Sequence, residues 1–317
     1  MKQWSINGSI SFLKLWGSFS IVSHHIVTIT KKKRSRYYRG LAFGTFGFCT
    51  KWAICPKGIN AEWLEVVYED LKLRNLPKTF EQMRIVQASD FHFSRTVSGN
   101  YLKHCIQRIN SLEPDVVVLT GDYVTHDMYG RFSRKIAHLL SRLHAKHGVY
   151  ATLGNHDYGR GGGISVERNF SLDDMIDSFQ AVGIHVLRNE AGYLEKDEHK
   201  LWFVGLGDLW SGDFEPAKAF GQVDSEGPVI TLSHNPEAVE HIEEYDFDAM
   251  VCGHTHGGRF EWTTMPDRPL VNRRQFSSGM YTVHERPMYV NRGLGRHGRL
   301  FNQRPEITVF TLCDNKE

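Results

Sequence analysis

Cysteine is scarce in this sequence and gives no sign of a disulfide framework. The 317 residues hold five cysteines, an odd number, and no Cys-x-x-Cys pair. Cys105, Cys252 and Cys313 lie in or beside apolar segments, so we expect them to be thiols of the core rather than disulfide or metal ligands. The cysteines leave the cellular compartment open.

Acidic residues are missing from the first 61 residues, which hold ten lysines and arginines. The other 256 residues carry 28 basic and 36 acidic side chains, so the net charge of +2 combines a leader of +10 with a body of −8. A mildly acidic body argues against nucleic acid as the main ligand. A basic leader without acidic residues indicates contact with a membrane surface or export.

A long uninterrupted apolar segment is also missing. Residues 10–30 and 41–54 are apolar but are broken by polar residues such as Lys14 and Lys51. Neither run reaches the roughly 20 apolar residues of a membrane-spanning helix. A basic cluster at 31–36, followed by about ten apolar residues, is nevertheless typical of a signal or short anchor. We predict a membrane-associated or exported protein with a leader over residues 1–60. The alternative is a cytoplasmic protein whose leader is disordered or is a mistranslated start.

What is present is the pattern of one folded domain. The sequence is 41% hydrophobic and 23% charged, which is ordinary for a globular protein, and no internal repeat is evident. We assign residues 61–317 to a single domain. Apolar runs alternate with segments of helical spacing, such as 132–145, which predicts βαβ units and an α/β fold.

Five of these apolar runs end in residues of metal-binding type. The runs cover residues 84–89, 115–120, 149–153, 228–233 and 248–252. The polar residues that follow them are Asp90 and His92, Asp122, Asn155 with His156, His234, and His254 with His256. Ligands in open α/β sheets bind beyond the carboxyl ends of the strands, so these side chains are expected to converge although they are far apart in sequence.

Seven converging ligands exceed the four that a single tetrahedral zinc uses, and they suit a pair of metal ions. Carboxylate, imidazole and carboxamide groups together favour Mn, Fe or Zn over calcium, which takes oxygen ligands. Any one of these histidines taken alone would more often be a structural residue. The repetition at five strand ends is what predicts a metal centre.

The order of these motifs resembles the calcineurin-like metallophosphoesterases. The motifs are Asp90-Phe-His92, Gly121-Asp122, Gly154-Asn155-His156-Asp157, the single His234, and Gly253-His254-Thr255-His256. The resemblance implies an αββα sandwich of two mixed sheets flanked by helices. Further motifs, Gly207-Asp-Leu-Trp210 and Arg292-Gly-Leu-Gly295 with Arg304-Pro-Glu306, resemble a bacterial branch named for phosphodiesterases or for UDP-diacylglucosamine pyrophosphatase-like enzymes. Members of that branch often begin with an export signal or anchor.

Carried over to this chain, the resemblance implies two metal sites that share one ligand. The first would be held by Asp90, His92, Asp122 and His256. The second would be held by Asp122, Asn155, His234 and His254. The paired ions would activate water for attack on a phosphate ester. His156 is the candidate general acid for the leaving group, and Asp157 is the candidate residue that orients it.

The expected function is therefore metal-dependent hydrolysis of a phosphoester, and phosphodiesterase activity is the favoured prediction. Alternatives within the same class are a pyrophosphatase that acts on a UDP-sugar-lipid and a phosphomonoesterase. From another class, the alternative is a non-catalytic metal-bound scaffold at a membrane surface. The substrate would be a small molecule or a lipid-linked phosphoester or pyrophosphate. We expect Trp210 in the core, or in the wall of a lipid or sugar pocket, and we expect Arg292 and Arg304 in structural ion pairs.

Overall fold

The computed structural model describes residues 63–315 except 126, 128–129, 160–171, 225, 258–275 and 296–303. The predicted leader over residues 1–60 lies outside the described residues. Within this described part, no helix has the length and apolarity needed to cross a membrane. The leader and the division at residue 60 stay predictions.

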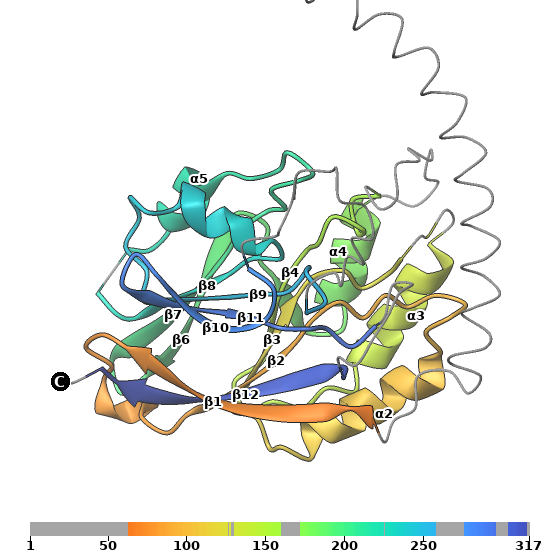
Figure 1. Cartoon of the computed structure of the whole chain (residues 1–317), viewed down its shortest axis with the longest axis horizontal. Helices are drawn as coiled ribbons and strands as arrows, with labels where there is room; N and C mark the ends of the chain where they lie inside the picture. The colour runs from red at the N-terminus through yellow and green to blue at the C-terminus, as the bar shows by residue number, and fades with distance from the viewer. Residues whose placement is uncertain are drawn as a thin grey trace, which may run out of the picture. The chain divides into compact units, whose positions relative to one another are not determined.

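Two six-stranded mixed sheets form the centre of the domain (Figure 1). The first has the strand order β1 (Glu65–Leu73), β12 (Glu306–Asp314), β2 (Arg84–Ala88), β3 (Val116–Thr120), β4 (Val149–Thr152) and β5 (Ile184–Val186). Strands β2 to β5 run parallel, whereas β12 is antiparallel to β2 and parallel to β1.

The second sheet also has four parallel strands, but it has an antiparallel strand at each edge. Its order is β10 (Gly279–Val283), β11 (Arg286–Val290), β9 (Ala249–Cys252), β8 (Val229–Leu232), β7 (His199–Gly205) and β6 (Glu190–Lys196). Strands β11, β9, β8 and β7 are parallel, and β10 and β6 pair antiparallel at the two edges. Each sheet therefore has four parallel strands.

Helices cover the outer faces of both sheets. The helices α2 (Gly99–Asn110), α3 (Arg131–Leu140) and α4 (Leu172–Gln180) pack on the first sheet. The short helix α5 (Pro216–Phe220) and the 3-10 helix η3 (Pro236–His241) pack on the second, and η2 (Lys78–Phe80) joins β1 to β2. Figure 1 shows α5 on the opposite side of the sheets from α2, α3 and α4. The predicted αββα sandwich is confirmed.

Strands inside the sandwich are apolar on both faces because both faces are covered. In β3, Val116 and Val118 point into the cluster between the sheets, whereas Val117 and Leu119 point into the cluster under α2, α3 and α4. All four are fully buried. This is why the strand reads as a continuous apolar run rather than as an alternation of apolar and polar residues.

Helix ends follow local hydrogen bonds. The Ser98 hydroxyl accepts from the Tyr101 N–H and starts α2, and the Asn235 side chain accepts from the Glu237 N–H at the start of η3. We predicted that α3 continues to residue 145, but it ends at Leu140. The Asn110 side chain donates to the carbonyl of Arg142 and accepts from the N–H of His144, which holds this segment outside the helix.

Strand β1 was not predicted from the sequence. Only Leu71 and Leu73 of its nine residues are fully buried, since it forms the edge of the sheet. An edge strand with one covered end has a weak apolar pattern. The three thiols in the described part are free. Cys105 and Cys252 are buried in the core, as expected, whereas Cys313, also expected there, is only half-buried.

Candidate metal centre

The seven predicted metal ligands all follow the carboxyl ends of parallel strands. They come from the loops after β2, β3 and β4 of the first sheet and after β8 and β9 of the second. Six of them are at least nine-tenths buried, and the seventh, His256, keeps 29% of its side chain exposed. The centre therefore lies where the carboxyl ends of both sheets meet.

The structure brings six of these residues into two groups of ligand atoms. Asp90, His92 and His256 form one group, and Asp122, His234 and His254 form the other, each with its atoms within 4.8 Å of one another. In the first group, the two Nε2 atoms of His92 and His256 are 3.0 Å apart. In the second, His254 Nδ1 is 3.2 Å from His234 Nε2.

Asp122 lies between the two groups. Its Oδ2 atom is 3.2 Å from His234 Nε2 and 3.5 Å from His92 Nε2. Asn155, the seventh predicted ligand, is buried in the turn after β4, and its neighbours touch Asp122. The His156 N–H donates to Asp122 Oδ1, and a Cβ atom on Gly154 would lie 2.3 Å from that oxygen. Only glycine fits this close approach.

The charge of Asp122 controls the electrostatics among the residues of this centre. Burial disfavours its ionised form, but the imidazoles of His234 and His92 outweigh burial and hold the pKa of Asp122 well below its usual value. Burial likewise opposes protonation of His234, and Asp122 overcomes it and raises the pKa of His234 to about 10. A buried carboxylate whose ionised form is stabilised by neighbouring imidazoles is also suited to a metal cation.

Five of the seven candidate ligands have backbones in the left-handed region. Their φ angles are between 45° and 72°, for Asp90, His92, Asp122, His254 and His256. This conformation costs roughly 1 kcal/mol or more for a residue with a Cβ atom. The sum of about 5 kcal/mol is comparable with the whole net stability of many domains. Neighbouring contacts must offset it, and such strain is typical of functional sites.

The side chain of Asp157 joins the loop after β3 to the loop after β4. Its carboxylate accepts hydrogen bonds of 2.9 Å from the backbone N–H groups of Gly154, Asp122 and Tyr123, and a longer bond from Val124. Burial and the charge of Asp122 raise the pKa of Asp157 to about 7, while these N–H groups act in the opposite direction. The carboxylate therefore fixes the Asp122 loop against the loop that carries Asn155 and His156.

The ring of His156 has a backbone partner that sequence reasoning missed. Its Nδ1 lies 2.8 Å from the carbonyl oxygen of Thr125. His156 is half-buried, and one of its ring nitrogens lies within 4.8 Å of ligand atoms of His92 and Asp122. We predicted that Asp157 orients His156. The described hydrogen bonds of the Asp157 carboxylate go to backbone N–H groups, so Asp157 supports the loop that carries His156.

A second supporting loop, 293–295, lies against Asp90. The N–H of Gly295 donates to the Asp90 carbonyl, and the N–H of Leu294 donates to the Ser89 carbonyl. Gly293 has a φ of 79°, and a Cβ atom there would lie 2.5 Å from the Asp90 Cβ. The sequence motif at 292–295 is therefore explained by the close approach of two backbones.

Of the two arginines of that region, Arg292 forms the expected ion pairs with described residues, whereas Arg304 forms hydrogen bonds to backbone carbonyls instead. Arg292 pairs with Glu306 and with Glu65, and Arg304 donates to the carbonyl of Trp63. Glu306 is buried and also accepts hydrogen bonds from Tyr289 and Thr308. Trp210 is not in the core, contrary to our favoured expectation: it is 45% exposed and its ring packs edgewise on His254.

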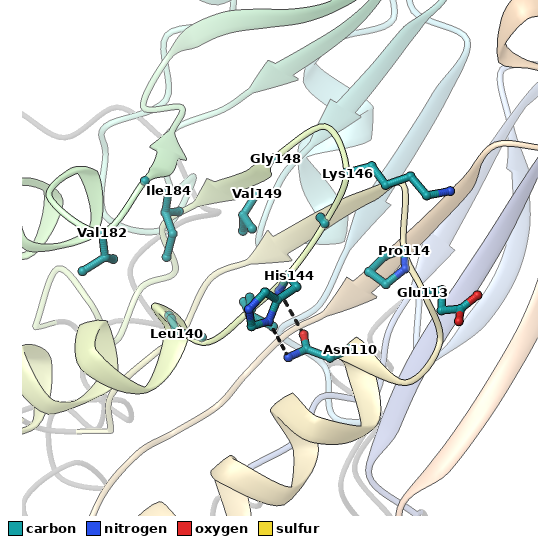
Figure 2. Close-up of a pocket in the computed structure, with 13 residues that line it drawn as sticks. Asn110, Glu113, Pro114, Leu140, His144, Lys146, Gly148, Val149, Val182 and Ile184 are labelled. Atoms are coloured by element: carbon teal, nitrogen blue, oxygen red, sulfur yellow. Dashed lines mark hydrogen bonds between the residues drawn. The ribbon is translucent and has the colours of Figure 1, made fainter.

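A large surface hollow elsewhere on the domain is distinct from this centre. It measures about 590 Å³ and is lined by residues such as Pro114, Gly148 and Ile184 (Figure 2). Pro114 and Gly148 precede β3 and β4, and Ile184 is the first residue of β5, so the hollow lies at the amino ends of the strands. The candidate ligands follow the carboxyl ends of the strands, at the opposite edge of the sheet.

The donor set fits a divalent metal. Asp90 Oδ1 is buried and accepts no hydrogen bond from the described residues, although His256 Nε2 is 3.4 Å away. Carboxylate oxygens that face imidazole nitrogens in this way are typical of sites for Mn, Fe or Zn. An αββα sandwich with such a centre at the carboxyl ends of its strands defines the class of metal-dependent phosphoesterases.

The comparisons with known proteins agree with this class. A family model described as calcineurin-like phosphoesterase matches residues 83–258. The phosphodiesterase YaeI of Escherichia coli is 32% identical over 253 residues, which cover 79% of this chain and 88% of that protein. The chain belongs to the calcineurin-like phosphoesterase family, and it is a hydrolase of phosphoester or pyrophosphate bonds.

Two further relatives have similar identity. The UDP-2,3-diacylglucosamine pyrophosphatase LpxG of Chlamydia trachomatis is 32% identical over 287 residues, which cover 74% of this chain and 86% of that protein. The uncharacterized metallophosphoesterase YkuE of Bacillus subtilis is 31% identical over 294 residues, which cover 89% of this chain and 98% of that protein. The family uses divalent metals, which agrees with the donor set described above.

Substitution of Asp157 tests its role in joining the loops. Asp157→Ala leaves four buried backbone N–H groups without their acceptor, and each such group costs about 1–3 kcal/mol. We expect the free energy of unfolding, measured by urea denaturation, to fall by about 3 kcal/mol or more. Asp177→Ala, at an exposed position of α4, is the matched control and should change it by less than about 0.5 kcal/mol. Equal effects of the two substitutions would contradict the joining role.

Proposed function

We propose that this protein hydrolyses phosphodiesters with two bound divalent metal ions, manganese, iron or zinc. The observation that supports two ions is the position of Asp122, whose Oδ2 atom faces His234 in one ligand group and His92 in the other. A carboxylate placed in this way can serve both ions. In this proposal one ion is held by Asp90, His92, Asp122 and His256, and the other by Asp122, Asn155, His234 and His254.

A pair of bound divalent ions supplies activated water and neutralises the phosphate oxygens. The chain itself supplies the proton for the leaving group. The Thr125 carbonyl accepts from His156 Nδ1 in this proposal, so an imidazolium at this position would deliver its second proton from Nε2. Asp157 keeps the loop of His156 in place through the backbone.

The relatives support a substrate in which phosphorus has two substituents. One relative of 32% identity is named a phosphodiesterase, and another of the same identity is named a pyrophosphatase of a UDP-linked lipid. Both cleave a bond at a phosphorus that carries a second ester or anhydride group. A pyrophosphatase acting on a lipid-linked nucleotide is therefore the second candidate function.

The first experiment compares a nitrophenyl phosphodiester with its monoester. The full-length protein is stripped of metal, reloaded with manganese and assayed beside Asp122→Asn. We expect turnover of the diester, and a loss of at least about 10²-fold in the variant together with lower manganese content, since even outer-shell partners of a metal contribute 10–100-fold. Retained rate and manganese content in the variant would contradict the shared-ligand assignment. No diester turnover by the manganese-loaded wild-type protein would favour the lipid pyrophosphatase or a scaffold.

His156 is tested by changing the leaving group. His156→Ala should lower kcat by about 10²–10⁴-fold for an alkyl diester, whose alkoxide needs a proton, and far less for a nitrophenyl diester. Alkyl diester hydrolysis is followed by chromatographic release of the alcohol. Equal losses for the two substrates would indicate that His156 positions the phosphate instead.

The leader supports a smaller proposal, that the full-length protein binds an anionic membrane surface and draws a lipid-linked substrate from it. Ten basic and no acidic residues before Glu62 suit such a surface, and each contributes about 1 kcal/mol near it. We expect cosedimentation with phosphatidylserine vesicles at 50 mM salt and release at 500 mM. Equal binding to neutral vesicles would oppose an electrostatic role.

A further inference from the structure

Trp210 stands out among the exposed apolar side chains of the described residues. Four large ones are more than a third exposed: Tyr68, Tyr193, Trp210 and Met280. Trp210 is the one that contacts a candidate metal ligand. The ring centroids of Trp210 and His254 are 4.3 Å apart, with the ring planes at 86°. An exposed indole at this position lies within reach of a substituent on a phosphate bound at the centre.

We propose that Trp210 forms a stacking subsite for a planar ring, a nucleobase or an aryl group, carried by the phosphate of the substrate. This inference rests on the proposed function, because it requires the phosphate to bind at the metal centre. It goes further by stating what one substituent of the phosphorus must be. The argument depends on the rigidity of the loop that carries Trp210 and on the groups around the indole.

The loop of residues 207–215 holds Trp210 in a fixed position. Both ends of the loop meet one buried side chain: Asn189 Oδ1 accepts from the N–H of Gly207 at 2.8 Å and from the N–H of Glu215 at 3.0 Å. Within the loop, Asp208 Oδ2 accepts from the N–H of Ser211 at 2.7 Å. A loop closed at its base and braced inside loses little entropy when a ligand binds.

The same loop is tied to the loop of the catalytic candidate. Asp213 accepts hydrogen bonds from Arg188 at 2.7 and 3.1 Å and from the hydroxyl of Tyr158 at 2.5 Å. Tyr158 directly follows Asp157 in the chain, so Asp213 connects the Trp210 loop to the turn of Asn155 and His156. The indole is therefore positioned relative to the centre before any ligand arrives.

The chemistry around the indole favours a ring over an acyl chain or a second anion. The Nε1–H of Trp210 donates to Glu237 Oε2 at 3.3 Å, which places a half-buried carboxylate beside the ring. That carboxylate repels a further negative charge and can accept a hydrogen bond from an N–H group on a base. A rigid indole stacks well on planar rings, and stacking contributes beyond the burial of area alone.

Calorimetry on the manganese-loaded, full-length protein tests this subsite without depending on turnover. The probes are methylphosphonate, benzylphosphonate, cyclohexylmethylphosphonate and uridine 5′-monophosphate. They differ in the group on phosphorus: a methyl group without a ring, a methylene that bears a planar aryl ring, a methylene that bears a non-planar ring of similar size, or a nucleoside joined through oxygen. We expect wild-type protein to bind benzylphosphonate, the uridine nucleotide or both about tenfold more tightly than methylphosphonate.

Trp210→Ala should remove this preference and change the Kd of methylphosphonate by less than about twofold, while Trp210→Phe should keep most of it. Tyr193→Ala is the matched control, because Tyr193 is also 45% exposed but lies on the edge strand β6. It should leave all four Kd values unchanged. Equal manganese content in the three variants shows that the centre is intact.

The outcomes separate the subsite from the proposed function. Preference for benzylphosphonate alone identifies an aryl group, and preference for the nucleotide identifies a base. Equal binding of all probes by the wild-type protein would overturn the subsite even if diesters are hydrolysed. Equal gains from the planar and non-planar rings, both lost in Trp210→Ala, would replace stacking with a general apolar contact and would also overturn it. No hydrolysis of any diester, with the ring preference present, would instead contradict the proposed function.

Discussion

The face-to-face packing of two sheets is the constraint on which the rest of the structure depends. Burial of the side chains between the sheets, such as Val118 from one and Phe203 from the other, sets how the two rows of strand ends lie relative to each other. The candidate ligands come from both rows. A displacement of one sheet over the other would separate Asp122 from His234. The packing of the apolar interior therefore fixes the distances between the candidate ligands at the edge of the sheets.

The loops at that edge are held by backbone contacts rather than by the ligands themselves. Asp157 fixes two loops of the first sheet, and the segment 293–295 lies against Asp90. Glu306 in turn holds Arg292 at the start of that segment. These contacts are buried and polar, and they offset the unfavourable backbone angles of the candidate ligand residues. The centre is thus held in place by neighbouring residues that contact the backbones of Asp90 and Asp122.

Much of this could be predicted from sequence, for a physical reason. Strands buried on both faces leave continuous apolar runs, and the residues after them must lie at one edge, so the five strands and their terminal ligands were accessible to pattern analysis. The edge strand β1 was not, because it has little buried surface. Nor were the Thr125 contact of His156 or the exposure of Trp210, since a carbonyl partner and a loop's direction depend on tertiary contacts that leave no local pattern. The end of α3 depended on Asn110, a residue of another helix.

The left-handed backbone of five candidate ligand residues affects how the centre can be dissected by mutagenesis. Asparagine tolerates this conformation better than most residues with a Cβ atom, whereas alanine and β-branched residues do not share that tolerance. Alanine at Asp90 or His254 therefore changes the conformational energy of the loop together with the loss of a candidate metal ligand. An asparagine scan keeps the backbone preference closer to that of the native residue. At such positions, the effect of an alanine substitution combines the loss of the side chain with a change in the stability of the loop. An alanine scan would therefore overstate what each side chain contributes to metal binding.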